Sequence, residues 1–60
     1  MLSLDTIQQR LRSACIADVA RATGLHYNTC RYVRSGKLNN PTYRVMQLLS
    51  EYFEAQDRAQ

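Results

Sequence analysis

A run of hydrogen-bonding side chains lies between Gly24 and Gly36, in the middle of this sequence of 60 residues. A helix over this segment, at about 100° per residue, would gather an amide, a guanidinium, a phenol and a hydroxyl on one arc. These groups belong to Asn28, Arg31, Tyr32 and Ser35. The opposite arc would carry Thr29, Cys30 and Val33. Such a helix fits the major groove of duplex DNA, where each base pair presents its own pattern of donors and acceptors.

The charged residues are unevenly distributed along the chain. The net charge is +3, from eight Lys and Arg against five Asp and Glu. Between Arg10 and Arg44, seven basic residues stand against a single acid, Asp18. The two ends of the chain are mildly acidic. A basic middle is typical of a surface that contacts a polyanion.

Other chemistries find little support in the residue types. Two cysteines, Cys15 and Cys30, are too few for a disulfide framework, and we expect both to be small buried hydrophobes. The single histidine, His26, has no metal-ligand spacing and no nucleophile–base–acid set around it, which favours a binding protein without metal or cofactor over an enzyme. No apolar run is long enough for a membrane span, and the start lacks a signal-peptide pattern, so we expect a cytoplasmic protein.

Hydrophobic periodicity predicts an all-α chain of four helices. The expected helices cover about residues 3–14, 16–23, 27–35 and 41–54. Ser3 is the expected first N-cap, and Gly24 and Gly36 are expected to end the second and third helices. Asn40 and Pro41 predict the cap and first residue of the fourth. We therefore predict one domain over residues 1–54 and a frayed tail over 55–60.

The segment from Ile16 to Lys37 resembles the helix-turn-helix of the lambda-type phage repressor and Cro family, also called XRE-like regulators. The sequence there is IADVARATGLHYNTCRYVRSGK. The resemblance rests on Ala20 four residues before Gly24, on Gly36-Lys37, and on the loop with its proline over residues 38–43; it covers about residues 4–53. It implies a compact lambda-repressor-like fold and a phage or prophage repressor that occupies an operator in the bacterial cytoplasm or nucleoid.

The resemblance also implies roles for single residues, because in this family the third helix reads bases and the loop after it holds phosphates. The implied base-reading residues are Tyr27, Asn28, Arg31 and Tyr32. Asn28 would pair with adenine and Arg31 with guanine. The implied phosphate contacts are Arg34, Lys37, Asn39, Asn40, Thr42 and Arg44. His26 is expected at the start of the helix, and Tyr43 falls on an apolar position of the family and is expected in the core.

The fourth predicted helix has more apolar side chains than one core face needs. Met46, Tyr52 and Phe53 are therefore candidates for a two-fold dimer patch, since a dimer on DNA pairs with a palindromic operator. No small-molecule ligand is expected.

Two alternatives stay open. An excisionase or MerR-like module shares the reading segment but follows it with a β-wing, against the helical period seen here. An antirepressor or antitoxin-like module would keep the fold and use the fourth helix to bind a protein partner.

Overall fold

The computed structural model describes residues 1–38 and 40–59. Within these ranges there are four α-helices and no strand. The helices are α1 (Leu4–Arg12), α2 (Ile16–Thr23), α3 (Tyr27–Ser35) and α4 (Tyr43–Ala59). The all-α prediction is confirmed, and the β-wing alternative is contradicted because a helix occupies the place of the wing. No helix in the described ranges is long and apolar enough to cross a membrane.

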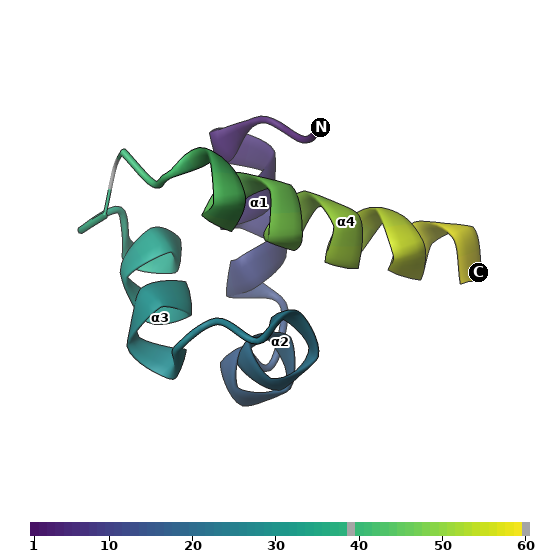
Figure 1. The fold of residues 1–60 in the computed structure, drawn as a ribbon, viewed down its shortest axis with the longest axis horizontal. Coiled ribbons are helices and arrows are strands. Elements are labelled where there is room, and N and C mark those ends of the chain that lie inside the picture. The colour runs from purple at the N-terminus through teal and green to yellow at the C-terminus, as the bar shows by residue number, and fades with distance from the viewer. Residues whose placement is uncertain (39, 60) are drawn as a thin grey trace.

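The helices pack as two crossed layers around one core. α3 packs against α1 and α2, and α4 packs against the same two helices. Figure 1 shows α4 crossing in front of α1, with its C-terminal end projecting past the other three helices. This packing leaves one side of α3 uncovered.

The core takes residues three or four positions apart from every helix, which is the spacing of one helix face. Its buried members are Ile7, Leu11, Ile16, Val19, Ala20, Cys30, Val33, Leu49 and Phe53. Full burial of a Val, Leu, Ile or Phe side chain stabilises a fold by about 1.5–3 kcal/mol. This core fixes the angle at which α3 stands against α1 and α2.

The ends of the first three helices follow local capping rules. Ser3 caps α1 by accepting a hydrogen bond from the Thr6 amide at 3.2 Å. Gly24 and Gly36 end α2 and α3 with φ angles of 78° and 84°. Glycine adopts this left-handed conformation without the strain that a Cβ would bring. Ser3 therefore begins α1, and Gly24 and Gly36 end α2 and α3, as the sequence predicted.

Both predicted ends of the fourth helix were wrong. α4 begins at Tyr43, and the cap is Thr42 rather than Asn40. The Thr42 hydroxyl accepts from the Val45 amide at 3.4 Å, and its carbonyl accepts from the Met46 amide at 3.1 Å. The helix also runs past Glu54 to Ala59, so residues 55–59 are helical; residue 60 lies outside the described ranges.

A contact between distant segments supports the last turns of α4. The Arg10 guanidinium donates two hydrogen bonds to the Asp57 carboxylate, at 3.0 and 3.1 Å. The same guanidinium lies 5.0 Å from the centroid of the Phe53 ring. The hydrogen bonds from Arg10 lower the pKa of Asp57 and raise that of Arg10. This pair connects the C-terminal end of α4 to α1.

We expect the free energy of unfolding to decrease in acid through Asp57. Because its pKa is lower in the folded state, ionised Asp57 stabilises the fold above its ordinary pKa of 3.8. That stabilisation is lost as the pH falls through the folded-state pKa. The pair is partly exposed, at 35% for Arg10 and 53% for Asp57, so the effect is small and decreases with added salt.

Urea unfolding of the parent and of Asp57→Asn between pH 7 and pH 2.5 measures this contribution. The parent should be the more stable protein at pH 7, and the two curves should converge in acid. A difference that stays constant across the pH range would contradict the assignment.

Candidate nucleic-acid interface

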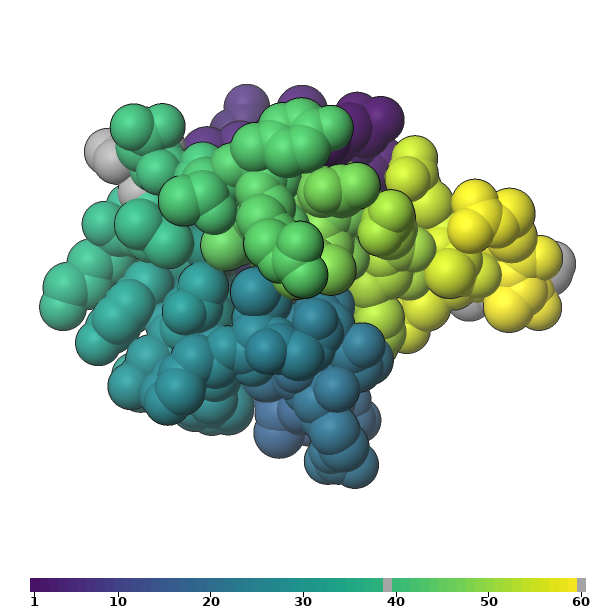
Figure 2. Space-filling view, in the orientation of Figure 1, coloured from purple at the N-terminus to yellow at the C-terminus, as the bar shows by residue number. Residues whose placement is uncertain are grey.

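The two faces of α3 divide as the sequence predicted. Cys30 and Val33 are fully buried, and Thr29 is half-buried. The outward arc, which consists of Asn28, Arg31, Tyr32 and Ser35, is exposed. In Figure 2 the teal side chains of α3 reach the surface at the left of the view. An amide, a guanidinium, a phenol and a hydroxyl are thus presented together on one uncovered helix.

His26 positions the first turn of α3. Its backbone is extended, with φ −67° and ψ 144°, and its Nδ1 accepts a hydrogen bond from the Asn28 amide at 3.0 Å. The imidazole therefore serves as the N-cap, as expected for a residue at the helix start. With Nδ1 as acceptor, the neutral ring carries its proton on Nε2. The cap fixes the backbone that carries the side-chain amide of Asn28.

Replacing His26 with Ala should destabilise the protein by about 1 kcal/mol, the usual cost of a lost N-cap. The loss arises because the backbone N–H of Asn28 would no longer have the imidazole as its hydrogen-bond acceptor. His26→Ser is the matched variant, since its hydroxyl can restore the cap. Urea unfolding followed by circular dichroism measures both. Equal destabilisation by Ala and Ser would show that the imidazole acts through something other than capping.

Two cations lie over aromatic rings on this face. The Arg31 guanidinium is 5.9 Å from the centroid of the Tyr27 ring, one helical turn away. The Lys37 ammonium is 4.9 Å from the centroid of the Tyr32 ring. Such contacts are worth about 0.5–1 kcal/mol at exposed sites. They pair three of the four implied base-reading residues, Tyr27, Arg31 and Tyr32, with a ring or a cation. The residue-by-residue assignment missed these pairs, although the spacing of Tyr27 and Arg31 indicates one of them.

The turn after α3 is fixed by its own hydrogen bonds. The Ser35 hydroxyl donates to the Tyr32 carbonyl and accepts from the Lys37 amide, both at 3.3 Å. The Leu38 amide donates to the same Tyr32 carbonyl at 3.0 Å, and Leu38 packs against the core. Lys37 is therefore held at the end of the outward arc.

The implied phosphate contacts lie within this turn and on either side of it in the sequence. Arg34 is half-buried, and the others in the described ranges are exposed: Lys37, Asn40, Thr42 and Arg44. The Thr42 hydroxyl is already engaged as the cap of α4. Asn39 lies outside the described residues.

Comparisons with family models, with curated proteins and with solved structures find no match to this chain. The likeness to lambda-type repressors therefore rests on the residue pattern alone.

Three predicted positions differ in the structure. Phe53 is 1% exposed and belongs to the core, so its side chain is not at the surface of a single copy; Met46 and Tyr52 are half-buried against the same core. Tyr43 is 71% exposed instead of buried, because it begins α4 at the edge of the fold. Cys15 is exposed at the N-cap of α2, whereas Cys30 is buried, which raises the pKa of its thiol.

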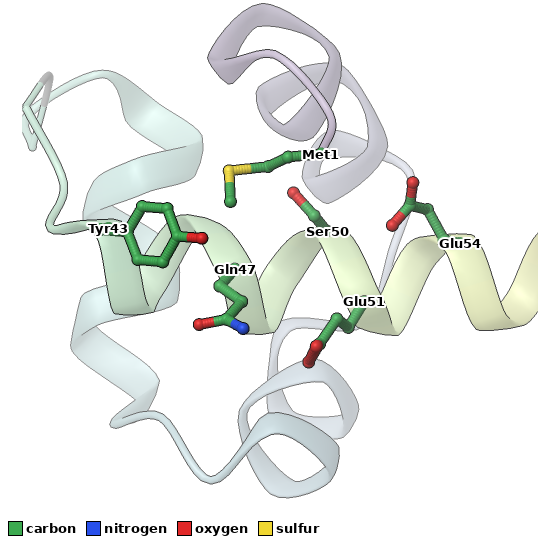
Figure 3. A pocket seen from close by; sticks show the side chains of 6 residues that line it. All are labelled: Met1, Tyr43, Gln47, Ser50, Glu51 and Glu54. Carbon is green, nitrogen blue, oxygen red and sulfur yellow. The ribbon is translucent and has the colours of Figure 1, made fainter.

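A hollow of about 270 Å³ lies between the N-terminal segment and α4. Its lining residues are Met1, Tyr43, Gln47, Ser50, Glu51 and Glu54. Figure 3 shows Met1 above α4, between Tyr43 and Glu54. The two carboxylates, of Glu51 and Glu54, make this hollow unsuited to a polyanion, so we do not count it as part of the candidate interface. Within the described ranges, no three His, Cys, Asp or Glu residues gather as a metal site would require.

Proposed function

We propose that this chain is a sequence-specific duplex-DNA-binding regulator of transcription, built on a lambda-repressor-like helix-turn-helix of α2 and α3. The observation that carries the proposal is the outward arc, which presents groups of base-reading chemistry on a helix whose other face is buried. A left-handed glycine, Gly24, joins the two helices, and they pack against each other. This arrangement supports a binding protein rather than an enzyme.

In the proposed complex, α3 lies in the major groove. Asn28 pairs with the N6 and N7 edge of adenine, and Arg31 donates to O6 and N7 of guanine. Tyr27 and Tyr32 contact base edges or the sugar beside them. Arg34, Lys37, Asn40, Thr42 and Arg44 contact phosphates, and Asn39 remains a prediction of the sequence. The N-terminus of α4 adds a favourable dipole for an anion.

We propose repression by operator occupancy, in a phage or prophage setting within the bacterial cytoplasm. Two copies would bind a palindrome, because one nine-residue helix reads few base pairs. Phe53 has no part in the contact between the copies. Met46 and Tyr52, which are half-buried, remain candidates for its edge.

Selection of bound sequences from a random duplex pool with purified protein tests this function. An enriched palindrome with half-sites about one helical turn apart supports the two-fold regulator. An enriched single half-site supports base reading by a monomer. No enrichment, together with tight capture of a protein partner, would overturn the proposal in favour of the antirepressor or antitoxin-like module.

A further inference from the structure

The basic side chains before residue 40 differ in whether a carboxylate or an aromatic ring of the protein is paired with them. Arg10 and Arg21 pair with carboxylates, those of Asp57 and Asp18. Arg31 and Lys37 lie over tyrosine rings. Among the described residues, Arg12 and Arg34 have no carboxylate within ion-pair distance and no ring beneath them. These two guanidinium groups are therefore available to an outside anion.

Arg12 and Arg34 line one hollow of about 460 Å³, together with Ser35. No carboxylate is among its lining residues. Ser35 also belongs to the outward arc, so the hollow opens beside the C-terminal end of that arc. Its hydroxyl already holds the turn after α3, which leaves the two guanidinium groups as the donors for a ligand.

A contact between helices sets the two arginines side by side. The Gln8 side-chain amide donates to the Val33 carbonyl at 3.2 Å, which joins α1 to the last turns of α3. Arg12 follows Gln8 by four residues and so lies on the same face of α1. Arg34 directly follows Val33 on α3. The pairing of Arg12 with Arg34 is therefore a property of the fold.

The chemistry of this pair selects a phosphate oxygen. Two cations that share one hollow repel each other until an anion enters between them. The planar donors of a guanidinium match the geometry of a phosphate, and each arginine can take one non-bridging oxygen. Cations in the last turn of a helix also interact favourably with the helix dipole, but that effect does not require both to line the same space.

We propose that Arg12 and Arg34 form a clamp for one phosphodiester of the DNA backbone, beside the groove that α3 occupies. This inference rests on the proposed function and adds Arg12, from outside the helix-turn-helix, to its contacts. The clamp fixes how deeply and at what angle α3 enters the groove, because a phosphate contact positions a protein without reading sequence.

The test measures the salt dependence of binding to a duplex of arbitrary sequence. Each lost phosphate contact should reduce the slope of log K against log salt by about 0.9. We expect this decrease in Arg12→Gln and in Arg34→Gln, and about twice the decrease in the double variant. Arg58→Gln is the matched control, since it removes the same charge from the far end of α4. Circular dichroism establishes that each variant is folded.

Slopes for the clamp variants that equal the slope of Arg58→Gln would overturn the clamp while leaving DNA binding intact. If the parent binds no duplex, the proposed function fails. Titration with inorganic phosphate then tests separately whether Arg12 and Arg34 bind an anion. The titration is followed by nuclear magnetic resonance. Shifts of the Arg12 and Arg34 side-chain resonances, with no shift of the Arg58 resonance, would support an anion site even if the protein does not bind DNA. No shift at either arginine would overturn the clamp as well.

Discussion

Phe53→Ala is expected to unfold most of the protein rather than to separate two copies. The Phe53 side chain is 1% exposed and meets Tyr52 edge-on, with ring centroids 5.1 Å apart and Arg10 on its face. Truncating a buried Phe to Ala costs about 3–5 kcal/mol. A domain of this size has a stability of only about 3–9 kcal/mol, at 0.05–0.15 kcal/mol per residue. One substitution therefore removes a large share of the total.

Urea unfolding followed by circular dichroism measures the loss, and sedimentation over a range of concentrations measures the mass. Phe53→Leu is the matched variant, because it keeps an apolar group of similar size and should cost much less. A folded Phe53→Ala protein with full stability and a reduced mass would return Phe53 to a dimer patch and contradict its place in the core.

The parts of the fold that the sequence predicts well are those set by local chemistry. The bounds of α2 and α3 agree residue for residue with the expected 16–23 and 27–35. Gly24 and Gly36 end these helices through a backbone conformation that glycine adopts freely, so no distant contact is needed. Periodicity alone assigned Cys30 and Val33 to the inner face of α3.

The errors at the end of α4 and at Phe53 involve contacts between segments that are far apart in the sequence. The pair of Arg10 with Asp57 joins the last turns of α4 to α1, and no local pattern indicates it. The family resemblance placed Tyr43 in the core, but a helix that begins at this residue leaves its ring outside. Phe53 lies in the core because α4 packs against α1 and α2, an orientation that its apolar arc alone does not determine.

The candidate interface shows the same division. The outward arc lies on one helix and was predicted from its period. The hollow between Arg12 and Arg34 joins two helices, so the residue pattern of either helix alone does not indicate it. The contact of Gln8 with Val33 joins α1 to α3 and so brings Arg12 to the same hollow as Arg34.

Asn28→Ala and Arg31→Ala should each remove discrimination at one base pair of a half-site. A good bidentate contact to a base is worth about 1–3 kcal/mol, or about 5- to 150-fold in relative affinity. Affinities for the selected site and for each of its single-base variants, measured at one salt concentration, give the loss position by position. Preference at the other base pairs should persist, because distant contacts contribute independently. Gln9→Ala is the matched control for Asn28, since it removes an exposed amide from α1.

Arg31→Lys separates base reading from charge at the same residue. The lysine keeps the positive charge but loses the planar pair of donors that guanine O6 and N7 require. We expect loss of preference at one base pair with an unchanged salt slope, in contrast to the clamp variants, which should change the slope and leave preference intact. An Arg31→Lys protein that keeps its preference would make Arg31 a phosphate contact, and base reading would then rest on Asn28 and the tyrosines. Base contacts and phosphate contacts on α3 and beside it can thus be distinguished. Loss of a base contact changes the preference at one base pair, whereas loss of a phosphate contact changes the salt slope.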